Sequence, residues 1–318
     1  MTETPNTAPN APTPGRPAAV RCCVCGESRS TPWKERNLDR PLVPEDFLIT
    51  DARYGVTLSL VRCDGCGFIY AVDDELSRLT ALYEALEDQN YEDGEDFRGL
   101  QMSWLLRHCR KLRPEARSLL DVGAAAGLLL RQASELGFDA EGVEPSHSLV
   151  EAARAYGVAI HEGILPHDAV AGRNFDVVTT IDVIEHVSDP VALIRTAAQY
   201  LAPGGILAVV TPDVGSLAAR LLGARWWHFR LAHVCYFDRK SLDAAVASAG
   251  LRVVSRKRAK WFFEAGYLAD RMTQYLPVAG LNRFLRRVPG IRALYNVVIP
   301  LNLGDSFFLI LERIDDPA

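Results

Sequence analysis

Residues 118–130 read SLLDVGAAAGLLL, and they give the clearest indication of the fold in the chain. An apolar run carries one acid, Asp121, into a short turn closed by Gly123 and Gly127, and leucines resume directly afterwards. This is the pattern of a buried strand that turns into a helix. Doubly wound α/β folds begin with such a unit and hold a ligand at the carboxyl ends of their strands.

The chain after residue 118 alternates strand-like and helix-like segments, which indicates βαβ units and a mainly parallel sheet. We expect strands near 118–122, 139–144, 158–161, 175–181, 206–211, 251–257 and 306–313. We expect helices from Gly127 to Gly137, from Ser146 or Ser148 to Gly157, after Pro190, and over 239–249. With 318 residues and 48% hydrophobic content, the chain is long enough for an α/β core and a smaller module.

The turn itself indicates the kind of ligand. It does not match G-x-G-x-x-G, and Ala125 stands where a middle glycine would let a pyrophosphate approach the backbone, so a diphosphate is disfavoured. Asp121 at the strand end suits a ligand with a positive group. Glu144, seventeen residues after Gly127, offers two oxygens to the hydroxyls of a ribose. A ribose with a cationic amino-acid tail and no phosphate describes S-adenosylmethionine.

Five segments resemble, in order, the motifs of class I S-adenosylmethionine-dependent methyltransferases. They are LLDVGAAAGLLL, AEGVEPS, FDVVTTIDVIEHVSDP, LAPGGILAVVTP and AHVCYFDRKSLDAAVASAGL, within a likeness that covers residues 100 to 313. The resemblance implies a Rossmann-like, seven-stranded methyltransferase sheet with one antiparallel edge strand. The chain departs from the family pattern at Ala125, where glycine is usual.

The cosubstrate-binding residues are expected at the carboxyl edge of this sheet. Residues of the first turn and the second strand end carry the main contacts: Asp121, Gly123, Ala124, Gly127 and Glu144. By family analogy, Gly163 and Ile164 border the adenine, Asp182 and Val183 lie against the methionine part, and Tyr91 closes over the cosubstrate. The alternative is that the glycines only form a tight strand-to-helix turn.

Two cysteine pairs lie upstream, Cys22-x-x-Cys25-Gly26 and Cys63-x-x-Cys66-Gly67. A C-x-x-C turn holds two thiolates near one metal ion, the glycine relieves the backbone, and two such turns complete a tetrahedral site. The spacing predicts structural zinc without an open coordination position. Cys23 is a rival to Cys22 with poorer spacing, and a redox dithiol is the alternative use of such a motif.

The N-terminal segments RCCVCG, VRCDGCGFIYAVDDE and LYEALEDQNY, followed by a methyltransferase, resemble the zinc-ribbon methyltransferases of bacterial glycan and natural-product gene clusters. We therefore expect a disordered tail (1–20), a small zinc-binding ribbon (21–75), a helical connector (76–117) and a methyltransferase domain (118–318). Insertions that cap the substrate are expected at about 212–238 and 258–304, with a helical insertion near the C-terminus.

Methyl transfer to a hydroxyl requires a positioned nucleophile and a base. His186, preceded by Glu185, follows the fourth strand beside the expected methyl donor, and His233 lies in a later loop with His228 and Tyr236. We predict His186 or His233 as the base, with Glu185 beside it, against the alternative that these side chains cap or pack.

Charge constrains the partners. Residues 220–300 hold fifteen Lys or Arg against four acids, 15 − 4 = +11, whereas residues 71–96 hold ten acids and one base. The basic stretch predicts a small-molecule or glycan acceptor that is anionic, or a lipid-linked sugar met at a membrane surface; alternatively its charges neutralise the acidic segment. A pI near 5.8 argues against nucleic acid, so an RNA methyltransferase is the second hypothesis. Seven cysteines without an export signal favour a cytoplasmic enzyme.

Overall fold

The computed structural model describes residues 20–48, 53–87, 95–266, 268–269, 294–295 and 297–314. The expected tail up to residue 19, Tyr91 and most of the second insertion lie outside these residues.

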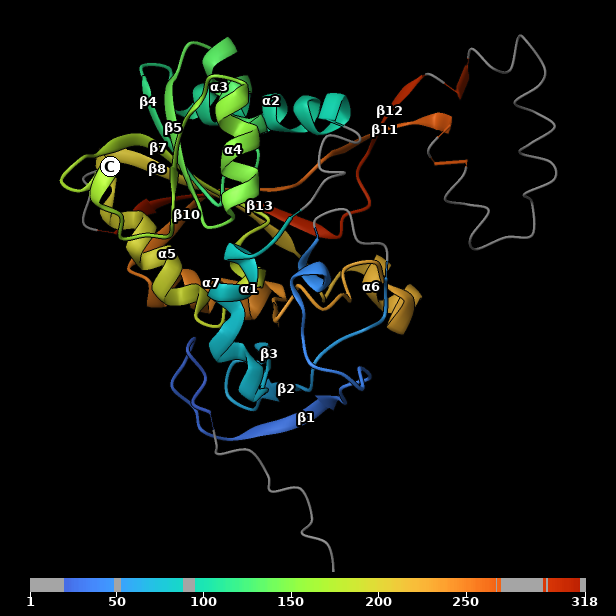
Figure 1. The fold of residues 1–318 in the computed structure, drawn as a ribbon. Coiled ribbons are helices and arrows are strands. Elements are labelled where there is room, and N and C mark those ends of the chain that lie inside the picture. The colour runs from blue at the N-terminus through green and yellow to red at the C-terminus, as the bar shows by residue number, and fades with distance from the viewer. Residues whose placement is uncertain are drawn as a thin grey trace, which may run out of the picture.

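A seven-stranded sheet forms the centre of the molecule (Figure 1) and confirms the expected α/β methyltransferase fold. Its order is β10-β13-β8-β7-β4-β5-β6. Its strands are β4 (Ser118–Val122), β5 (Asp139–Glu144), β6 (Ala159–Glu162), β7 (Phe175–Ile181), β8 (Leu201–Pro212), β10 (Leu251–Arg258) and β13 (Ser306–Arg313). Strands β4 to β8 pair in parallel, whereas β13 pairs antiparallel with both β8 and β10. We expected the antiparallel strand at the edge of the sheet. This expectation is wrong, because the antiparallel strand β13 lies between β8 and β10, and β10 forms the edge.

Both faces of the sheet are covered by helices, which explains why its central strands are apolar at nearly every position. In β8, Ile206, Ala208 and Val210 face one cluster, while Leu207 and Val209 face the other, as the two-residue period of a strand requires. The first face packs against α2 (Glu95–Leu112), α3 (Leu128–Glu135) and α4 (His147–Ala155). The second packs against α5 (Pro190–Gln199) and α7 (Arg239–Ser248).

The helix boundaries follow the expected capping signals. Ser146 accepts from the Leu149 N–H and starts α4, and Asp189 accepts from the Ala192 N–H ahead of Pro190 in α5. Shorter helical elements are α1 (Leu79–Glu84), α6 (Leu217–Leu222) and the 3-10 turns η1 (Pro44–Phe47), η2 (Asp74–Arg78), η3 (Asp168–Val170), η4 (Ile184–His186) and η5 (Gly223–Arg225).

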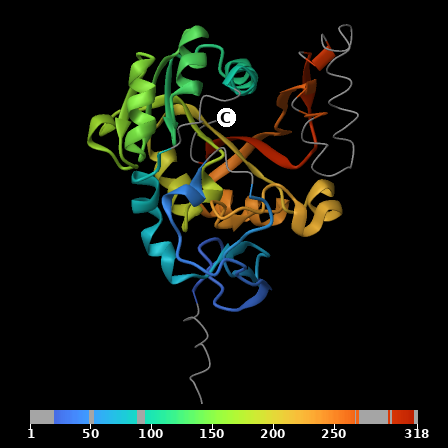
Figure 2. The ribbon, with the colours of Figure 1, turned by 45° about the vertical axis from the view of Figure 1, so that its right-hand side comes forward.

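The N-terminal module, residues 20–48 and 53–73, contributes three strands to a second sheet. They are β1 (Ser30–Lys34), β2 (Leu60–Cys63) and β3 (Ile69–Ala71), and the fourth strand, β9 (Cys235–Tyr236), comes from the methyltransferase part of the chain. Figure 2 shows the module beneath α7, where Ser248 Oγ donates to the Val24 carbonyl at 2.7 Å. The module thus shares a sheet with the rest of the protein. The expected boundaries of the module, 21–75, did not include the fourth strand of this sheet.

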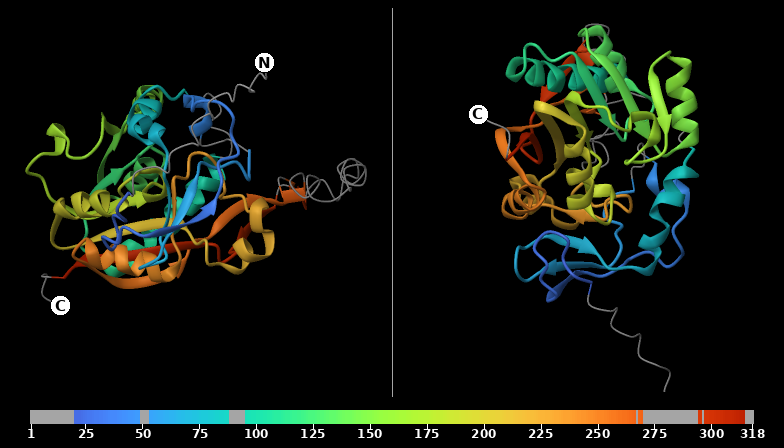
Figure 3. Two further views of the ribbon diagram at one scale, coloured as in Figure 1. Left: turned by 90° about the horizontal axis from the view of Figure 1, so that it is seen from below. Right: turned by 90° about the vertical axis from the view of Figure 1, so that its left-hand side faces the viewer.

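The described flanks of the C-terminal insertion form a two-stranded antiparallel sheet, β11 (Trp261–Glu264) with β12 (Val298–Leu301). These strands extend away from the main sheet (Figure 1 and Figure 3). Most of the predicted helical insertion lies outside the described residues, and the two strands at its flanks were not predicted. Within the part of the chain that the structure describes, no helix has the length and apolar character needed to span a bilayer.

Candidate active site and cysteine cluster

The turn after β4 is held in place by Glu144 at the end of β5. Its Oε2 accepts from the Ala125 N–H and its Oε1 from the Ser146 N–H, both at 2.9 Å. Ala125 stands where the family usually has glycine. Its φ of +46° is in the left-handed region, which glycine adopts more readily than alanine. Burial raises the pKa of the Glu144 carboxyl. Glu144 therefore orders the turn as well as facing the ligand edge of the sheet.

Gly123 is required by its close approach to Val183. A Cβ on Gly123 would lie 2.7 Å from Val183 Cγ2, and its φ of +76° already favours glycine. This contact joins the turn after β4 to the residues after β7, two places where the sequence predicted cosubstrate contacts. Gly127 instead packs beside α4, where a Cβ on it would lie 2.7 Å from Val158 Cγ2 and 3.2 Å from Ala153 Cβ.

Two acids lie at the same edge of the sheet. Asp121 accepts from Thr179 Oγ1 at 2.6 Å, and burial raises its pKa to about 7. Asp182 has φ +55° and a buried Oδ1 that has no partner among the described residues. Burial raises the pKa of Asp182 to about 7 as well, with Asp305 adding to the effect. An unpaired buried carboxylate oxygen is costly unless a ligand completes it.

Residues expected at the adenine lie at the end of β6. The Gly163 N–H donates to the Glu144 carbonyl at 2.9 Å, and Ile164 beyond it is 53% exposed. Ala124 is buried under Gly142, whose absent Cβ leaves the room that the Ala124 methyl group occupies. The structure thus brings the expected cosubstrate residues to one edge of β4 to β7, apart from Tyr91, which lies outside the described residues.

The three expected catalytic side chains also converge. One ligand atom from each of Glu185, His186 and His233 lies within 4.8 Å of the others, and the two imidazole rings meet edge to face at 4.7 Å. Glu185 Oε2 accepts from Thr211 Oγ1 at 2.9 Å. Burial lowers the pKa of His186 to about 3 and that of His233 well below its usual value, so both rings are neutral at neutral pH.

Sequence reasoning missed two residues of this region. Tyr83, from α1, places its hydroxyl 2.7 Å from His186 Nδ1. Asp305, just before β13, lies 3.4 Å from His228 Nε2. Tyr83 lies in an acidic connector and Asp305 in an apolar C-terminal segment, so neither has a local motif, and only the folded chain brings them here.

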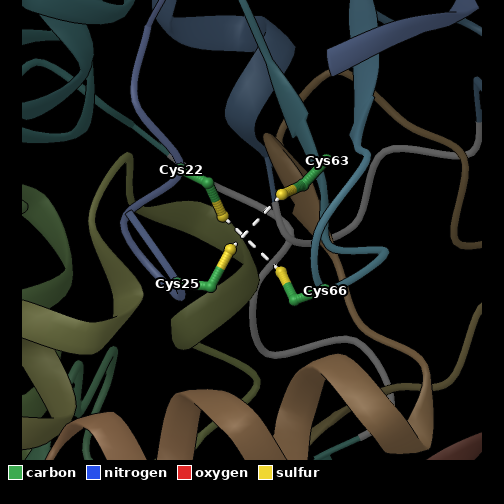
Figure 4. A group of neighbouring side chains, drawn as sticks. All are labelled: Cys22, Cys25, Cys63 and Cys66. Carbon is green, nitrogen blue, oxygen red and sulfur yellow. Dashed lines mark hydrogen bonds between the residues drawn. The ribbon is translucent and has the colours of Figure 1, made fainter. Parts of the chain in front are cut away.

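The four expected cysteines form one cluster (Figure 4). Cys22 Sγ lies 3.6 Å from Cys66 Sγ, and Cys25 Sγ lies 3.5 Å from Cys63 Sγ. The two turns match in their backbone: the Gly26 N–H donates to the Cys22 carbonyl, and the Gly67 N–H to the Cys63 carbonyl. Both glycines have positive φ, as the motif requires. Cys23 is not in the cluster.

Sequence comparison identifies the family. Residues 95–256 match the family model described as a methyltransferase domain. A ubiquinone biosynthesis O-methyltransferase of Methylobacterium nodulans is 34% identical over 158 residues, which are 46% of this chain and 64% of that protein. One from Azorhizobium caulinodans is 32% identical over 167 residues, 47% of this chain and 66% of its own length. The chain thus spans slightly less than two thirds of these relatives.

Among solved structures, the sugar N-methyltransferase KedS8 of a Streptoalloteichus species is 29% identical over 38% of this chain and 50% of its own, with a TM-score of 0.33. A methyltransferase of Clostridium acetobutylicum is 10% identical over 70% of this chain and 95% of its own, with a TM-score of 0.46. The family model covers half of the sequence, and the structure has the seven-stranded α/β sheet expected for the family. The chain therefore belongs to the methyltransferase domain family.

Proposed function

We propose that the protein transfers the methyl group of S-adenosylmethionine to an oxygen atom of a small-molecule acceptor. The observation that carries the proposal is the arrangement of Asp121, the Gly123 turn and Glu144 at one sheet edge. The relatives named O-methyltransferases support oxygen as the accepting atom. Their names give no support to a glycan or lipid-linked sugar, so the proposal is limited to a small molecule.

In this proposal Glu144 receives the ribose hydroxyls, and Asp121 and Asp182 face the cationic amino-acid part. Gly163 and Ile164 border the adenine, and Val183 packs beside the turn. S-adenosylmethionine supplies an electrophilic methyl group, and the protein aligns the acceptor oxygen with it and removes the proton. His186, His233 and Glu185 line the acceptor side. Neutral imidazoles there accept hydrogen bonds from an acceptor hydroxyl and fix its orientation.

The proposal is tested with tritiated S-adenosylmethionine and the small-molecule fraction of cells that naturally express the chain. We expect one labelled small molecule whose label is an O-methyl group by mass spectrometry, and unlabelled RNA and protein fractions. A labelled RNA fraction would favour the second hypothesis, and no transfer to any fraction would remove the proposed activity.

We further propose that the cysteine cluster binds one structural zinc ion through Cys22, Cys25, Cys63 and Cys66. Tetrahedral Zn–S bonds of about 2.3 Å place sulfurs about 3.8 Å apart, close to the observed 3.5 and 3.6 Å. Four thiolates leave no open position for chemistry, so the ion orders the module and the β3–β9 pairing.

A peripheral contact with anionic membrane is proposed from the basic 220–300 segment. Helix α6 overlaps the start of this segment. It carries two exposed leucines, Leu217 and Leu221, which are 70% and 77% exposed and lie on either side of Arg220 in the sequence. Apolar side chains flanked by cations are typical of interfacial helices. A cytoplasmic location fits the reduced cysteines that the zinc site needs.

A further inference from the structure

A carboxylate–imidazole pair, Asp305 and His228, lies at the carboxyl edge of β8 and is not among the residues that we propose to bind the cosubstrate. Asp305 directly precedes β13, whose Ser306 lies opposite Pro212, the last residue of β8. Its carbonyl accepts from the Asp213 N–H at 2.7 Å, which fixes the backbone at this edge. Asp305 therefore lies where β7 and β8 end, near Asp182, whose pKa it raises.

His228 reaches this carboxylate from the insertion after β8. His228 Nε2 and Asp305 Oδ2 are 3.4 Å apart, and the side chains are 12% and 2% exposed. The two atoms face each other without a well-aligned hydrogen bond, and neither has another partner among the described residues. A buried carboxylate beside an imidazole orients the ring and stabilises its protonated form.

The ring is held in place by its neighbours. It stacks on His233 at 5.7 Å with 20° between the planes, and meets Trp226 edge to face at 4.9 Å. Through His233 it adjoins His186, so the pair borders the proposed acceptor side of the site.

We propose that His228, oriented by Asp305, accepts the proton of the acceptor hydroxyl during methyl transfer. As the new O–CH₃ bond forms, the S–CH₃ bond breaks and its electrons stay on sulfur. The hydroxyl proton moves to the imidazole, giving an imidazolium beside the Asp305 carboxylate, S-adenosylhomocysteine and the methyl ether. Water then takes the proton. This inference rests on the proposed O-methylation.

The environment suits His228 better than its neighbours. Burial lowers its pKa, Asp305 raises it part of the way back, and Arg230 lowers it again. The ring is thus neutral at neutral pH, and the positive charge that it gains with a proton is balanced by the neighbouring Asp305 carboxylate. His186, by contrast, faces the Tyr83 hydroxyl through Nδ1, and burial followed by Arg230 lowers its pKa to about 3. The other carboxylate–imidazole pairs within 4.0 Å in the described chain, His147–Glu162 and His161–Glu141, lie around β5 and β6.

The test compares His228→Gln, Asp305→Asn and Asp305→Glu with the control His161→Gln, which breaks a carboxylate–imidazole pair away from the site. Turnover is measured with tritiated S-adenosylmethionine and the same small-molecule fraction. We expect His228→Gln to lower kcat by about 10²-fold or more with an unchanged KM for S-adenosylmethionine. Asp305→Asn should lower it by about tenfold, Asp305→Glu should restore part of the loss, and the control should match wild type.

A second readout does not need turnover. The His228 resonance, assigned by its loss in His228→Gln, is titrated by NMR in protein carrying ¹³C-labelled histidine. Asp305→Asn should lower the pKa of His228 by about one unit, because the balancing charge is gone. In wild type, kcat should rise with pH through the same pKa. An unchanged pKa in Asp305→Asn, or wild-type kcat in His228→Gln, overturns the proposal. The wild-type protein could methylate nothing while Asp305→Asn still lowers the pKa of His228. That result would contradict the proposed O-methylation, and the role of His228 in it as well.

Discussion

The carboxylate of Glu144 accepts a hydrogen bond of 2.9 Å from the backbone N–H of Ala125. A strand end and a turn nineteen residues earlier are thereby tied together at the place where a ribose is expected. The turn has no glycine at Ala125, so this bond supports a left-handed residue that bears a methyl group. We therefore expect Glu144 to have both a structural and a binding role, and its truncation to remove both.

Glu144→Ala is predicted to weaken binding of S-adenosylmethionine and S-adenosylhomocysteine by about 2–4 kcal/mol, since two charge-assisted hydrogen bonds to the ribose are lost. Calorimetry measures both ligands. Glu162→Ala is the matched control, because Glu162 is the register partner of Glu144 on β6 and its side chain is 44% exposed. Equal affinities of wild type and Glu144→Ala would contradict the ribose assignment.

Gly123→Ala is predicted to lower both stability and cosubstrate affinity, because its Cβ would meet Val183 and its φ is positive. Gly137→Ala separates these causes: Gly137 has φ +80° but nothing within 4 Å of a Cβ. We expect Gly137→Ala to cost about 1 kcal/mol of unfolding free energy and Gly123→Ala at least about 1 kcal/mol more. If urea unfolding gives the same decrease in unfolding free energy for both variants, the contact with Val183 does not add to the destabilisation.

The strands and helices of the main sheet could be predicted from sequence because their signals are local. Apolar runs, Ser146 and Asp189 as caps, and glycines after helices each act within a few residues. The Cys22 and Cys63 turns were also predictable, because their spacing encodes their geometry. Sequence reasoning also placed His186 and His233 in the same region, because they follow the ends of β7 and β8.

The missed features depend on contacts between distant segments. Strand β9 is two residues long and pairs with β3, where Tyr70 lies opposite Cys235, 235 − 70 = 165 positions later in the chain. Tyr83 and Asp305 meet histidines more than 70 residues from them in sequence, so no local pattern marks them. The place of β13 inside the sheet was missed for the same reason, because strand order is a property of the assembled sheet.

Binding of S-adenosylmethionine is predicted to strengthen as pH rises from about 6 to about 8. Burial raises the pKa of Asp121 to about 7 in the free protein, so the carboxyl is largely protonated below that pH and must ionise to attract the ligand's ammonium group. Asp121→Asn should reduce the slope of affinity against pH, measured by calorimetry. Adenosine, which lacks the amino-acid part, is the control ligand and should show a smaller slope. A wild-type slope in Asp121→Asn would place the ammonium elsewhere.

The raised pKa of Asp121 also affects the stability of the fold, which is predicted to fall as pH rises, whereas cosubstrate binding is predicted to strengthen. A carboxyl whose pKa is higher in the folded protein than in the unfolded chain stabilises the fold at low pH, and this contribution is lost as pH rises from 3.8, its ordinary pKa, through about 7. Unfolding free energy should therefore fall less steeply over this range in Asp121→Asn than in wild type. Urea unfolding at fixed ionic strength measures both curves, and parallel curves would contradict the raised pKa.

Peripheral membrane contact is predicted to require both charge and apolar surface. The protein should float with vesicles containing anionic phospholipid at low salt, remain unbound to neutral vesicles, and be released by salt, since each basic residue contributes about 1 kcal/mol near an anionic surface. Leu217→Ser with Leu221→Ser should weaken flotation, because these exposed side chains lie on α6. No flotation with anionic vesicles at low salt would reject the membrane contact and leave the soluble acceptor intact.

Replacement of Cys63 and Cys66 by Ser is predicted to remove one zinc ion per chain and to disturb the active site as well as the module. The Ala71 N–H donates to the Val234 carbonyl at 2.8 Å, and the Val234 N–H to the Glu185 carbonyl at 2.9 Å. Loss of the metal should therefore loosen β3 and, through Val234, the neighbouring residues His233 and Glu185.

Metal content is measured by mass spectrometry, and amide hydrogen exchange reports order at residues 231–237. Cys23→Ser is the matched control and should keep both the zinc and the protection, because Cys23 lies outside the cluster. Because the module's cysteines also pack in the same apolar cluster as Phe237 and Leu242, we expect faster exchange at 231–237 in the double variant while the strands β4 and β5 stay protected. Full metal content in the double variant would reject the zinc site. Unchanged exchange at 231–237 would show that the module does not order the segment that carries His233.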